Sequence, residues 1–354
     1  MTPRRPRSPS RRIAVVGAGI AGLACARTLQ RAGHAVQVFE AASAPGGRLA
    51  TQASPHGDFD SGAQYFTVRD ARFALALQST AADVARPWSA NAVRVLDEHG
   101  RVVEAALPAR EPHWVAVPGM RALPLRWAEP LGAAGALQLD TRVERIARDA
   151  LAPARWQLHT QGAGDTPRVH AGFDAVVLAT PPSPLREMLS KSQQLADLAE
   201  RLSAVDVAPC WTLMLAFPNA AQPGLHSLGP QWNAARSTHH RVAWLARESS
   251  KPGRGPVERW TVQASPAWSR EHENDDAARA GAKLLKAFAE ITGIRATPAC
   301  AETRLWRQAQ TLVPLGQPLV WDAALGIGLC GDWCIGHRVE DAFVSGLELA
   351  LAVG

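Results

Sequence analysis

The segment that decides the fold lies near the start of the chain, where residues 13–41 are IAVVGAGIAGLACARTLQRAGHAVQVFEA. The β-branched run at 13–16 predicts a buried parallel strand, and the fingerprint Gly17-x-Gly19-x-x-Gly22 follows it. The first glycine permits a tight turn, the second lets the backbone approach a pyrophosphate, and the third brings the helix close to the strand. The segment therefore predicts a βαβ unit that binds a dinucleotide.

The end of this segment carries an acid that suits a ribose. A second strand is expected over residues 35–39, after a helix that Gly33 would end, and Glu40 follows that strand directly. A carboxylate there accepts hydrogen bonds from ribose hydroxyls and would repel a 2′-phosphate. The fingerprint alone does not choose between NAD and FAD. In the turn at 46–48, Arg48 is either a second pyrophosphate ligand or a solvated side chain of an ordinary glycine turn.

Length and composition limit the class of protein. A chain of 354 residues predicts about two domains, and 47% hydrophobic with 20% charged residues is enough for a sizeable core. The formal net charge is +6, but residues 1–12 hold five arginines and no acid. We expect this stretch to be a disordered basic tail on a nearly neutral body. Nucleic acid is therefore not an expected partner.

The cysteines and the apolar runs bear on the location of the protein. No apolar run approaches the roughly 20 residues of a membrane-spanning helix, so no membrane partner is expected. The five scattered cysteines predict reduced thiols in a cytoplasmic protein, and no ligand spacing predicts a metal. Cys330 and Cys334 are expected to be small buried hydrophobes, the alternative being a redox disulfide beside the cofactor.

Further motifs occur in a fixed order along nearly the whole chain. They are GGRLAT (46–51), DFDSGAQYFTVRD (58–70), WVAVPGM (114–120), FDAVVLATPP (173–182), PCWTLMLAF (209–217), AWLARESSKPGR (243–254), ASPAWSREH (264–272) and CGDWCIGHRVEDAFVSG (330–346). In this order they resemble bacterial renalase-like flavoproteins, members of the FAD-dependent amine oxidase superfamily. GAQYF, SKPGR and CGDWC are far more specific than the glycine fingerprint.

The resemblance implies an α/β fold and a cofactor. The fold would be a Rossmann-like FAD-binding domain of the amine oxidase/PHBH type, interleaved with a second, sheet-containing substrate domain. The first domain would comprise residues 13–70, 135–182 and 318–354, and the second residues 71–134 and 183–317. FAD would be bound non-covalently.

The resemblance also implies site residues. Besides the three fingerprint glycines, the expected FAD contacts are Ala21, Glu40, Ala41, Arg48, Gln64, Tyr65, Asp332 and Val339. The substrate candidates are Trp114, Met120 and Trp211. Tyr65, the only tyrosine, either hydrogen-bonds the cofactor or is a core residue. Trp211 either stacks on a nicotinamide or flavin ring or is a core residue, as most of the twelve tryptophans must be. A helix beginning near Val339 would present its positive end to the flavin and favour the anionic reduced form. No catalytic acid or base is implied.

The implied reaction is oxidation of mis-reduced dinucleotides. A hydride would pass from the 2-dihydro or 6-dihydro isomer of NAD(P)H to flavin N5, giving NAD(P)+, and O2 would reoxidise the flavin to give H2O2. A flavin amine oxidase or desaturase and a non-catalytic flavin- or nucleotide-binding sensor remain alternatives. One stretch departs from the family pattern H-R-W-x-Y-A. Residues 304–309 are RLWRQA, which keeps the tryptophan but loses the histidine and tyrosine, so the substrate is open to change.

Overall fold

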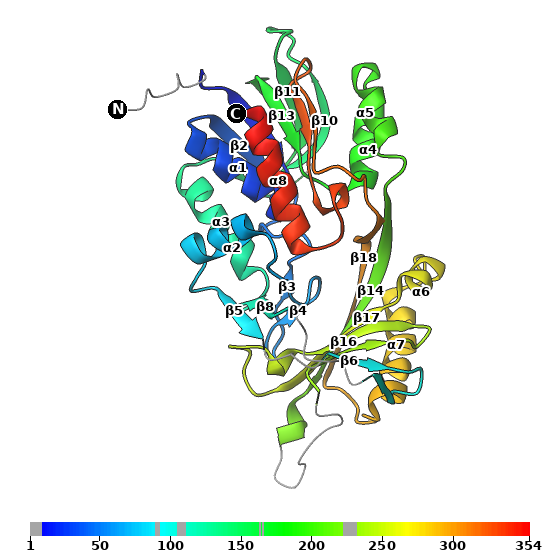
Figure 1. Cartoon of the computed structure of the whole chain (residues 1–354). Helices are drawn as coiled ribbons and strands as arrows, with labels where there is room; N and C mark the ends of the chain where they lie inside the picture. Colours follow the sequence, from blue (N-terminus) through cyan, green and yellow to red (C-terminus); the bar gives the residue numbers. More distant parts are fainter. Residues whose placement is uncertain (1–8, 89–92, 105–110, 163, 165, 222–231) are drawn as a thin grey trace. The chain divides into compact units, whose positions relative to one another are not determined.

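The computed structural model describes residues 9–88, 93–104, 111–162, 164, 166–221 and 232–354 (Figure 1). The chain forms two compact units, each assembled from segments that are distant in sequence. The first unit comprises residues 1–47, 127–205 and 313–354, and the second comprises residues 48–126 and 206–312. Within the described residues, no helix has both the length and the apolar character needed to cross a membrane.

The first unit is built on a six-stranded sheet in the order β19-β20-β13-β1-β2-β9. Its parallel strands are β1 (Arg12–Val16), β2 (Ala35–Phe39), β9 (Leu137–Gln138), β13 (Ala175–Leu178) and β20 (Ile327–Leu329), and β19 (Val320–Asp322) is antiparallel to β20. Ile13 on the central strand lies opposite Val36 and Ala175. The residues of β1 after Arg12 are buried, as a parallel strand covered on both faces requires.

Two helices of this unit pack closely on one another (Figure 1). They are α1 (Ile20–Ala32), which ends at the left-handed Gly33 as expected, and α8 (Val339–Val353). A Cβ on Gly346 of α8 would lie 2.0 Å from the carbonyl oxygen of Ala21 in α1. Only glycine allows this approach, so α8 lies directly against the first turn of α1.

The rest of the first unit is a three-stranded antiparallel sheet and several short helices. The sheet comprises β10 (Arg142–Arg148), β11 (Trp156–Gln161) and β12 (Pro167–Phe173). The helical elements are α4 (Pro182–Ser190), η1 (Gln193–Leu195), α5 (Ala196–Arg201) and η4 (Asp332–Cys334). Helix α3 (Ala122–Ala133) begins in the second unit and continues into the first, where its Trp127 packs against Phe343 of α8.

The second unit is built on a seven-stranded sheet in the order β18-β14-β17-β16-β15-β6-β7. Its strands are β6 (Val93–Leu96), β7 (Val102–Glu104), β14 (Asp206–Phe217), β15 (Ala234–Ser237), β16 (Val242–Arg247), β17 (Glu258–Ala264) and β18 (Cys300–Val313). Helices α6 (Pro266–Glu271) and α7 (Ala277–Thr292) supply core residues such as Trp268 and Phe288, which pack with Trp260 and Leu213 of the sheet.

Smaller elements complete the second unit. They are the strand pairs β3 (Thr51–Gln52) with β4 (Phe59–Asp60) and β5 (Ala85–Trp88) with β8 (His113–Ala116), helix α2 (Ala71–Thr80), and the short helices η2 (Pro218–Ala221) and η3 (Glu248–Ser250). Helices α6 and α7 are separated by residues 272–276. Asp276 accepts a hydrogen bond from the backbone N–H of Arg279 and so starts α7 at Ala277.

The two compact units begin and end at other residues than the expected domains. Residues 48–70 belong to the second unit, because Asp60 is held there by side chains of the same unit. Residues 127–134 and 183–205 belong to the first unit. The basic tail is shorter than expected: Arg12 is the first residue of β1, and residues 1–8 lie outside the described residues. The assignment of FAD and substrate to separate domains stays a prediction.

Candidate functional site

The glycine fingerprint of the first unit forms an open cradle at the N-terminus of α1. Gly17 has φ +101°, and a Cβ on Gly22 would lie 2.0 Å from the carbonyl oxygen of Gly17, so both glycines are needed for the turn itself. A Cβ on Gly19 would meet no atom within 4 Å, and no side chain caps the helix there. Gly19 therefore leaves space above free helical N–H groups, the arrangement that binds a pyrophosphate.

Glu40 closes the same loop. Its carboxylate accepts hydrogen bonds from the backbone N–H groups of Ala18, at 2.7 Å, and Ala42, at 2.9 Å. The acid therefore joins the end of β2 to the fingerprint loop in addition to any bond with a ribose. Ala41 is exposed beside it.

The start of α8 has a different character from the one expected. Val339 is the first helical residue, as predicted, but Glu340 and Asp341 occupy the first turn. Asp341 Oδ2 accepts a hydrogen bond from the backbone N–H of Arg338 at 2.9 Å. These carboxylates offset the positive end of the helix dipole, so the potential expected at this end is weaker than a bare helix terminus would give. Asp332 is buried in η4, before α8.

The cysteines of the first unit are buried thiols. Burial raises the pKa of Cys330 well above its usual value and that of Cys334 to about 12. Both thiols are free, and because the thiolate is the reactive form of cysteine, their burial favours the role of small hydrophobes over that of a redox pair.

In the second unit, residues 61–65 form a segment that we call the strap. Gly62 lies against the main chain of Arg48, because a Cβ on Gly62 would be 2.0 Å from the Arg48 carbonyl oxygen. The same oxygen accepts a hydrogen bond from Ala63 N–H at 2.9 Å. Arg48 and the strap, both expected to contact FAD, are thus brought together by the fold of this unit.

Side chains bind the carbonyl groups of the strap. Trp306 Nε1 donates to Ser61 O at 2.7 Å, and Gln263 Nε2 donates to Gly62 O, also at 2.7 Å. Gln64 Nε2 donates to Gly62 O at 3.0 Å and to Asp60 O. The side chain of Gln64 is therefore used within the protein, and a contact from Gln64 to a cofactor would come from its main chain.

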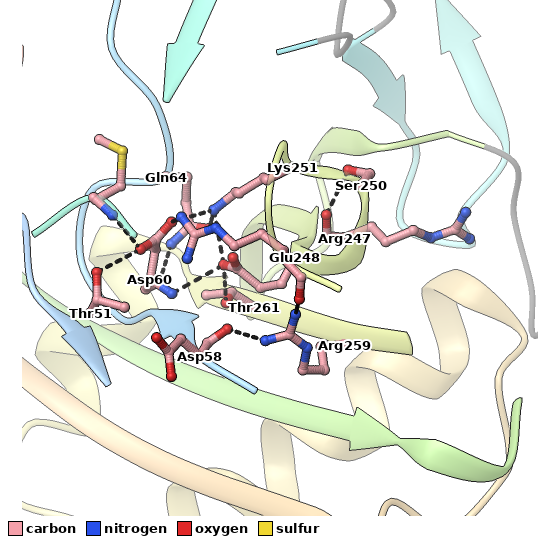
Figure 2. A network of polar contacts seen from close by, with 12 residues as sticks. Thr51, Asp58, Asp60, Gln64, Arg247, Glu248, Ser250, Lys251, Arg259 and Thr261 are labelled. Carbon is pink, nitrogen blue, oxygen red and sulfur yellow. Dashed lines mark hydrogen bonds and ion pairs between the residues drawn. The ribbon is translucent and has the colours of Figure 1, made fainter. Parts of the chain in front are cut away.

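Behind the strap lies a buried network of charged side chains (Figure 2). Lys251 Nζ lies 3.0 Å from Asp60 Oδ2 and 2.9 Å from Glu248 Oε1, and it donates to Gln64 Oε1 at 3.1 Å. Arg254 also pairs with Asp60. The side chains of Asp60, Glu248 and Lys251 are completely buried. The SKPGR motif thus supplies two of the cations that hold Asp60.

The two acids of the network have opposite electrostatic environments. Burial raises the pKa of Asp60, but the charges of Lys251 and Arg254 outweigh it, so the pKa lies below its usual value. Burial also raises the pKa of Glu248, the nearby charge of Asp60 adds to it, and the net shift is upward. Asp60 is therefore the more acidic carboxyl group of this network, and Glu248 the less acidic one.

Aromatic side chains gather at Tyr65. Its ring lies 4.2 Å from that of His113 and 5.4 Å from that of Trp244, measured between centroids. The indole N–H of Trp244 is buried and has no hydrogen-bond partner in the described part of the chain. Tyr65 is partly exposed, so the cluster reaches the surface of this unit. His113 and Trp244 were not predicted. Trp244 belongs to the motif at 243–254, whereas His113 only precedes the motif at 114–120.

The structure does not bring Trp114 to this cluster. Trp114 pairs with Phe66 through two main-chain hydrogen bonds of 2.8 Å, and it follows His113 on β8. Successive residues of a strand point to opposite faces, so Trp114 points away from the face that carries His113 and Tyr65.

The other two substrate candidates are interior residues. Trp211 packs in the core cluster of the seven-stranded sheet, and its indole N–H donates to the carbonyl of His272 at 2.9 Å. Met120 is fully buried, and its N–H donates to Asp60 Oδ1 at 2.8 Å. Trp211 thus has the position of a core residue, and Met120 supports the buried network.

The stretch that departs from the family pattern contacts the strap. Residues 304–309 lie in β18, where Trp306 binds Ser61 and Arg304 lies over the Trp306 ring at 4.0 Å from its centroid. The carbonyl of Ala309 accepts a hydrogen bond from Arg48 Nη1 at 3.2 Å. The changed residues are therefore neighbours of the residues expected to hold the cofactor.

Two known protein families match parts of this chain. The family described as NAD(P)-binding Rossmann-like domain matches residues 15–76, and the one described as flavin containing amine oxidoreductase matches residues 103–353. The chain belongs to the flavin-containing amine oxidoreductases. A flavin cofactor, typically non-covalent FAD, follows from this membership. The open cradle at Gly19 fits the pyrophosphate of such a cofactor.

One curated relative of this flavin-containing amine oxidoreductase is a desaturase. Hydroxyneurosporene desaturase of Cereibacter sphaeroides is 48% identical over 59 residues, which are 17% of this chain and 12% of that protein. The match thus spans only about an eighth of the length of this curated relative.

Solved structures show the same fold. A putative protoporphyrinogen oxidase from Exiguobacterium sp. 255-15 aligns with a TM-score of 0.74 at 14% identity, covering 98% of this chain and 99% of that one. Putrescine oxidase with bound putrescine aligns with a TM-score of 0.67 at 13% identity, covering 97% and 99%. At these identities the likeness concerns the fold alone.

Proposed function

We propose that this protein is a renalase-like FAD-dependent oxidase of mis-reduced dinucleotides, the 2-dihydro and 6-dihydro isomers of NAD(P)H. Bound FAD supplies a hydride acceptor at N5 and passes the electrons to O2, giving H2O2. The products would be NAD(P)+ and peroxide. The proposal rests on the order of the sequence motifs and on the aromatic cluster of Tyr65, His113 and Trp244.

The aromatic cluster is the observation that carries the proposal. A dihydronicotinamide is a planar ring with a carboxamide, so it requires an apolar aromatic surface and a hydrogen-bond donor. Tyr65 offers a partly exposed ring, and beside it the buried indole N–H of Trp244 has no partner in the described residues. Hydride loss restores the aromatic nicotinamide, so the reaction requires no proton acceptor. The acids of the second unit nearest the strap, Asp60 and Glu248, are buried and bonded to cations.

The proposal is tested by anaerobic reduction of the flavin. The purified holoprotein is mixed with the isomers formed by borohydride reduction of NAD+, and the blue absorption band of the flavin is followed, with NADH and benzylamine as controls. Rapid bleaching by the isomer mixture alone, with colour and peroxide returning in air, is the expected result. A flavin that stays oxidised with the isomers refutes the proposed substrate.

Amine oxidation or desaturation is the second candidate, favoured by the family match and by the desaturase relative. In the same experiment it predicts bleaching by an amine or an unsaturated hydrocarbon precursor and none by the isomers. A flavin that stays oxidised with every donor would instead indicate the third alternative, a flavin- or nucleotide-binding sensor.

A further inference from the structure

The buried network in the second unit contains more charge than a structural role requires. Asp60 and Glu248 share the interior with the cations Lys251, Arg254 and Arg259, all less than a tenth exposed. A buried ion pair gives little net stability compared with apolar side chains of similar volume. Five such groups in one place therefore suggest that the network does more than fill the core.

The network acts on the strap through Gln64. A glutamine amide can be turned end for end, but Lys251 Nζ can only donate, so its 3.1 Å hydrogen bond fixes Oε1 of Gln64 toward the lysine. Nε2 must then face the carbonyl groups of Asp60 and Gly62, and it bonds to both. Lys251 itself is held by Asp60 and Glu248.

This orientation determines what the strap offers to a ligand. The carbonyls of Asp60, Ser61 and Gly62 are occupied by side-chain donors. The main-chain N–H groups of Gln64 and Tyr65 have no partner in the part of the chain that the structure describes. A main-chain N–H group without a partner can donate to an acceptor atom of a ligand, and the isoalloxazine ring of a flavin carries carbonyl and imine acceptors.

We propose that Lys251 is a positioning residue for the flavin: through Gln64 it holds the strap so that the N–H groups of Gln64 and Tyr65 are available to the acceptor atoms of the ring. The inference rests on the proposed placement of FAD against Gln64 and Tyr65 and does not depend on which substrate is oxidised. Lys251 contacts neither reactant and acts through another side chain.

The test compares FAD binding in variants that keep the buried charge balanced. Lys251→Met with Glu248→Gln removes one cation and one anion, and Gln64→Leu removes the amide while leaving every charge in place. Glu248→Gln alone keeps the bond from Lys251 to Gln64. The matched control is Arg247→Met with Glu258→Gln, which removes the 3.1 Å ion pair between β16 and β17.

Three quantities are measured: the dissociation constant of FAD, the position of the flavin absorption band, and the urea unfolding of the apoprotein. We expect the K251M/E248Q and Q64L variants each to bind FAD about tenfold more weakly, as loss of a hydrogen bond to a charged group implies. The flavin band should shift in both. The control pair should keep wild-type affinity, and E248Q should lose less affinity than K251M/E248Q because Lys251 still bonds to Gln64. The triple variant K251M/E248Q/Q64L should be no weaker than Q64L.

Wild-type FAD affinity in Q64L overturns the inference, even if the lysine variants do not fold. A triple variant that loses affinity by the product of the two effects also overturns it, because Lys251 would then act independently of Gln64. A protein that shows the expected FAD affinities but does not oxidise dihydronicotinamide isomers contradicts only the proposed function. The two proposals therefore fail separately.

Discussion

Lys251 and Asp60 form an ion pair 3.0 Å long in which neither side chain is exposed. The two residues are 191 positions apart in the sequence, and the pair joins the SKPGR motif to the segment that contains GAQYF. Because a buried charge without its partner is strongly destabilising, this pair makes the two motifs depend on each other.

Asp60→Asn is expected to lower the free energy of unfolding by about 3–5 kcal/mol, because it leaves Lys251 and Arg254 buried without their shared anion. Urea unfolding measures the loss. The control is Asp206→Asn, which breaks a pair with Arg270 whose side chains are 42% and 44% exposed. That change should cost less than about 1 kcal/mol. Equal losses in the two variants would contradict the assignment of Asp60 as the anchor of the network.

The pH dependence of stability should reflect the opposite pKa shifts of the two acids. Burial raises the pKa of Glu248. Its contribution to the free energy of unfolding is therefore complete at low pH and is lost as the pH rises through the pKa of the folded state. Glu248→Gln should therefore gain stability relative to the wild type on going from about pH 5 to about pH 8. A pH-independent difference between the two unfolding free energies would refute this.

Asp60 should have the opposite effect on the pH dependence of stability, because its pKa is lowered. Although burial raises its pKa, Lys251 and Arg254 bring it below the usual value. Its contribution is therefore complete above the unfolded pKa of about 3.9 and is lost as the pH falls through the lower folded value. The stability difference between wild type and Asp60→Asn should stay constant from about pH 8 to about pH 5 and shrink only below about pH 4. Acid unfolding curves of the two proteins test this.

The glycines of the fingerprint should separate folding from cofactor binding. In Gly19→Ala the new Cβ would meet no protein atom within 4 Å, so the stability of the apoprotein should change by less than about 0.5 kcal/mol. The same Cβ would occupy the space expected for the pyrophosphate, so FAD affinity should fall. Gly22→Ala places a Cβ 2.0 Å from the Gly17 carbonyl oxygen and should destabilise the apoprotein by about 1–3 kcal/mol. Urea unfolding and FAD titration of both variants give the comparison. Unchanged FAD affinity in Gly19→Ala would exclude the cradle as the pyrophosphate site.

Trp244→Phe should weaken substrate binding more than it weakens the fold. The variant keeps the ring but removes an N–H that has no partner in the described residues. The control is Trp260→Phe, which removes an indole N–H that donates to Glu258 Oε1 at 2.8 Å. We expect Trp244→Phe to be about 1 kcal/mol less destabilising than the control and to raise KM for the dihydronicotinamide. If KM is unchanged, Trp244 does not belong to the substrate site.

The first unit could be predicted from local sequence to a large extent. The predicted strand at 35–39, the end of α1 at Gly33 and the start of α8 at Val339 are all confirmed. Each depends on contacts between near neighbours in the chain: a β-branched run, a glycine in the left-handed region, and a turn before an apolar helix. The spacing of apolar residues and a glycine at the end of a helix can be recognised in the sequence without knowledge of the tertiary structure.

The second unit shows what the sequence by itself determined and what it left to the tertiary structure. The sequence determined the family and the motifs that include Lys251, Gln64 and Tyr65. Only the fold decided that Lys251 pairs with Asp60 and binds Gln64, and that Tyr65 meets His113 and Trp244 rather than Trp114. These contacts join residues that lie far apart in the chain, and the face on which a strand residue lies depends on pairing that no local pattern encodes.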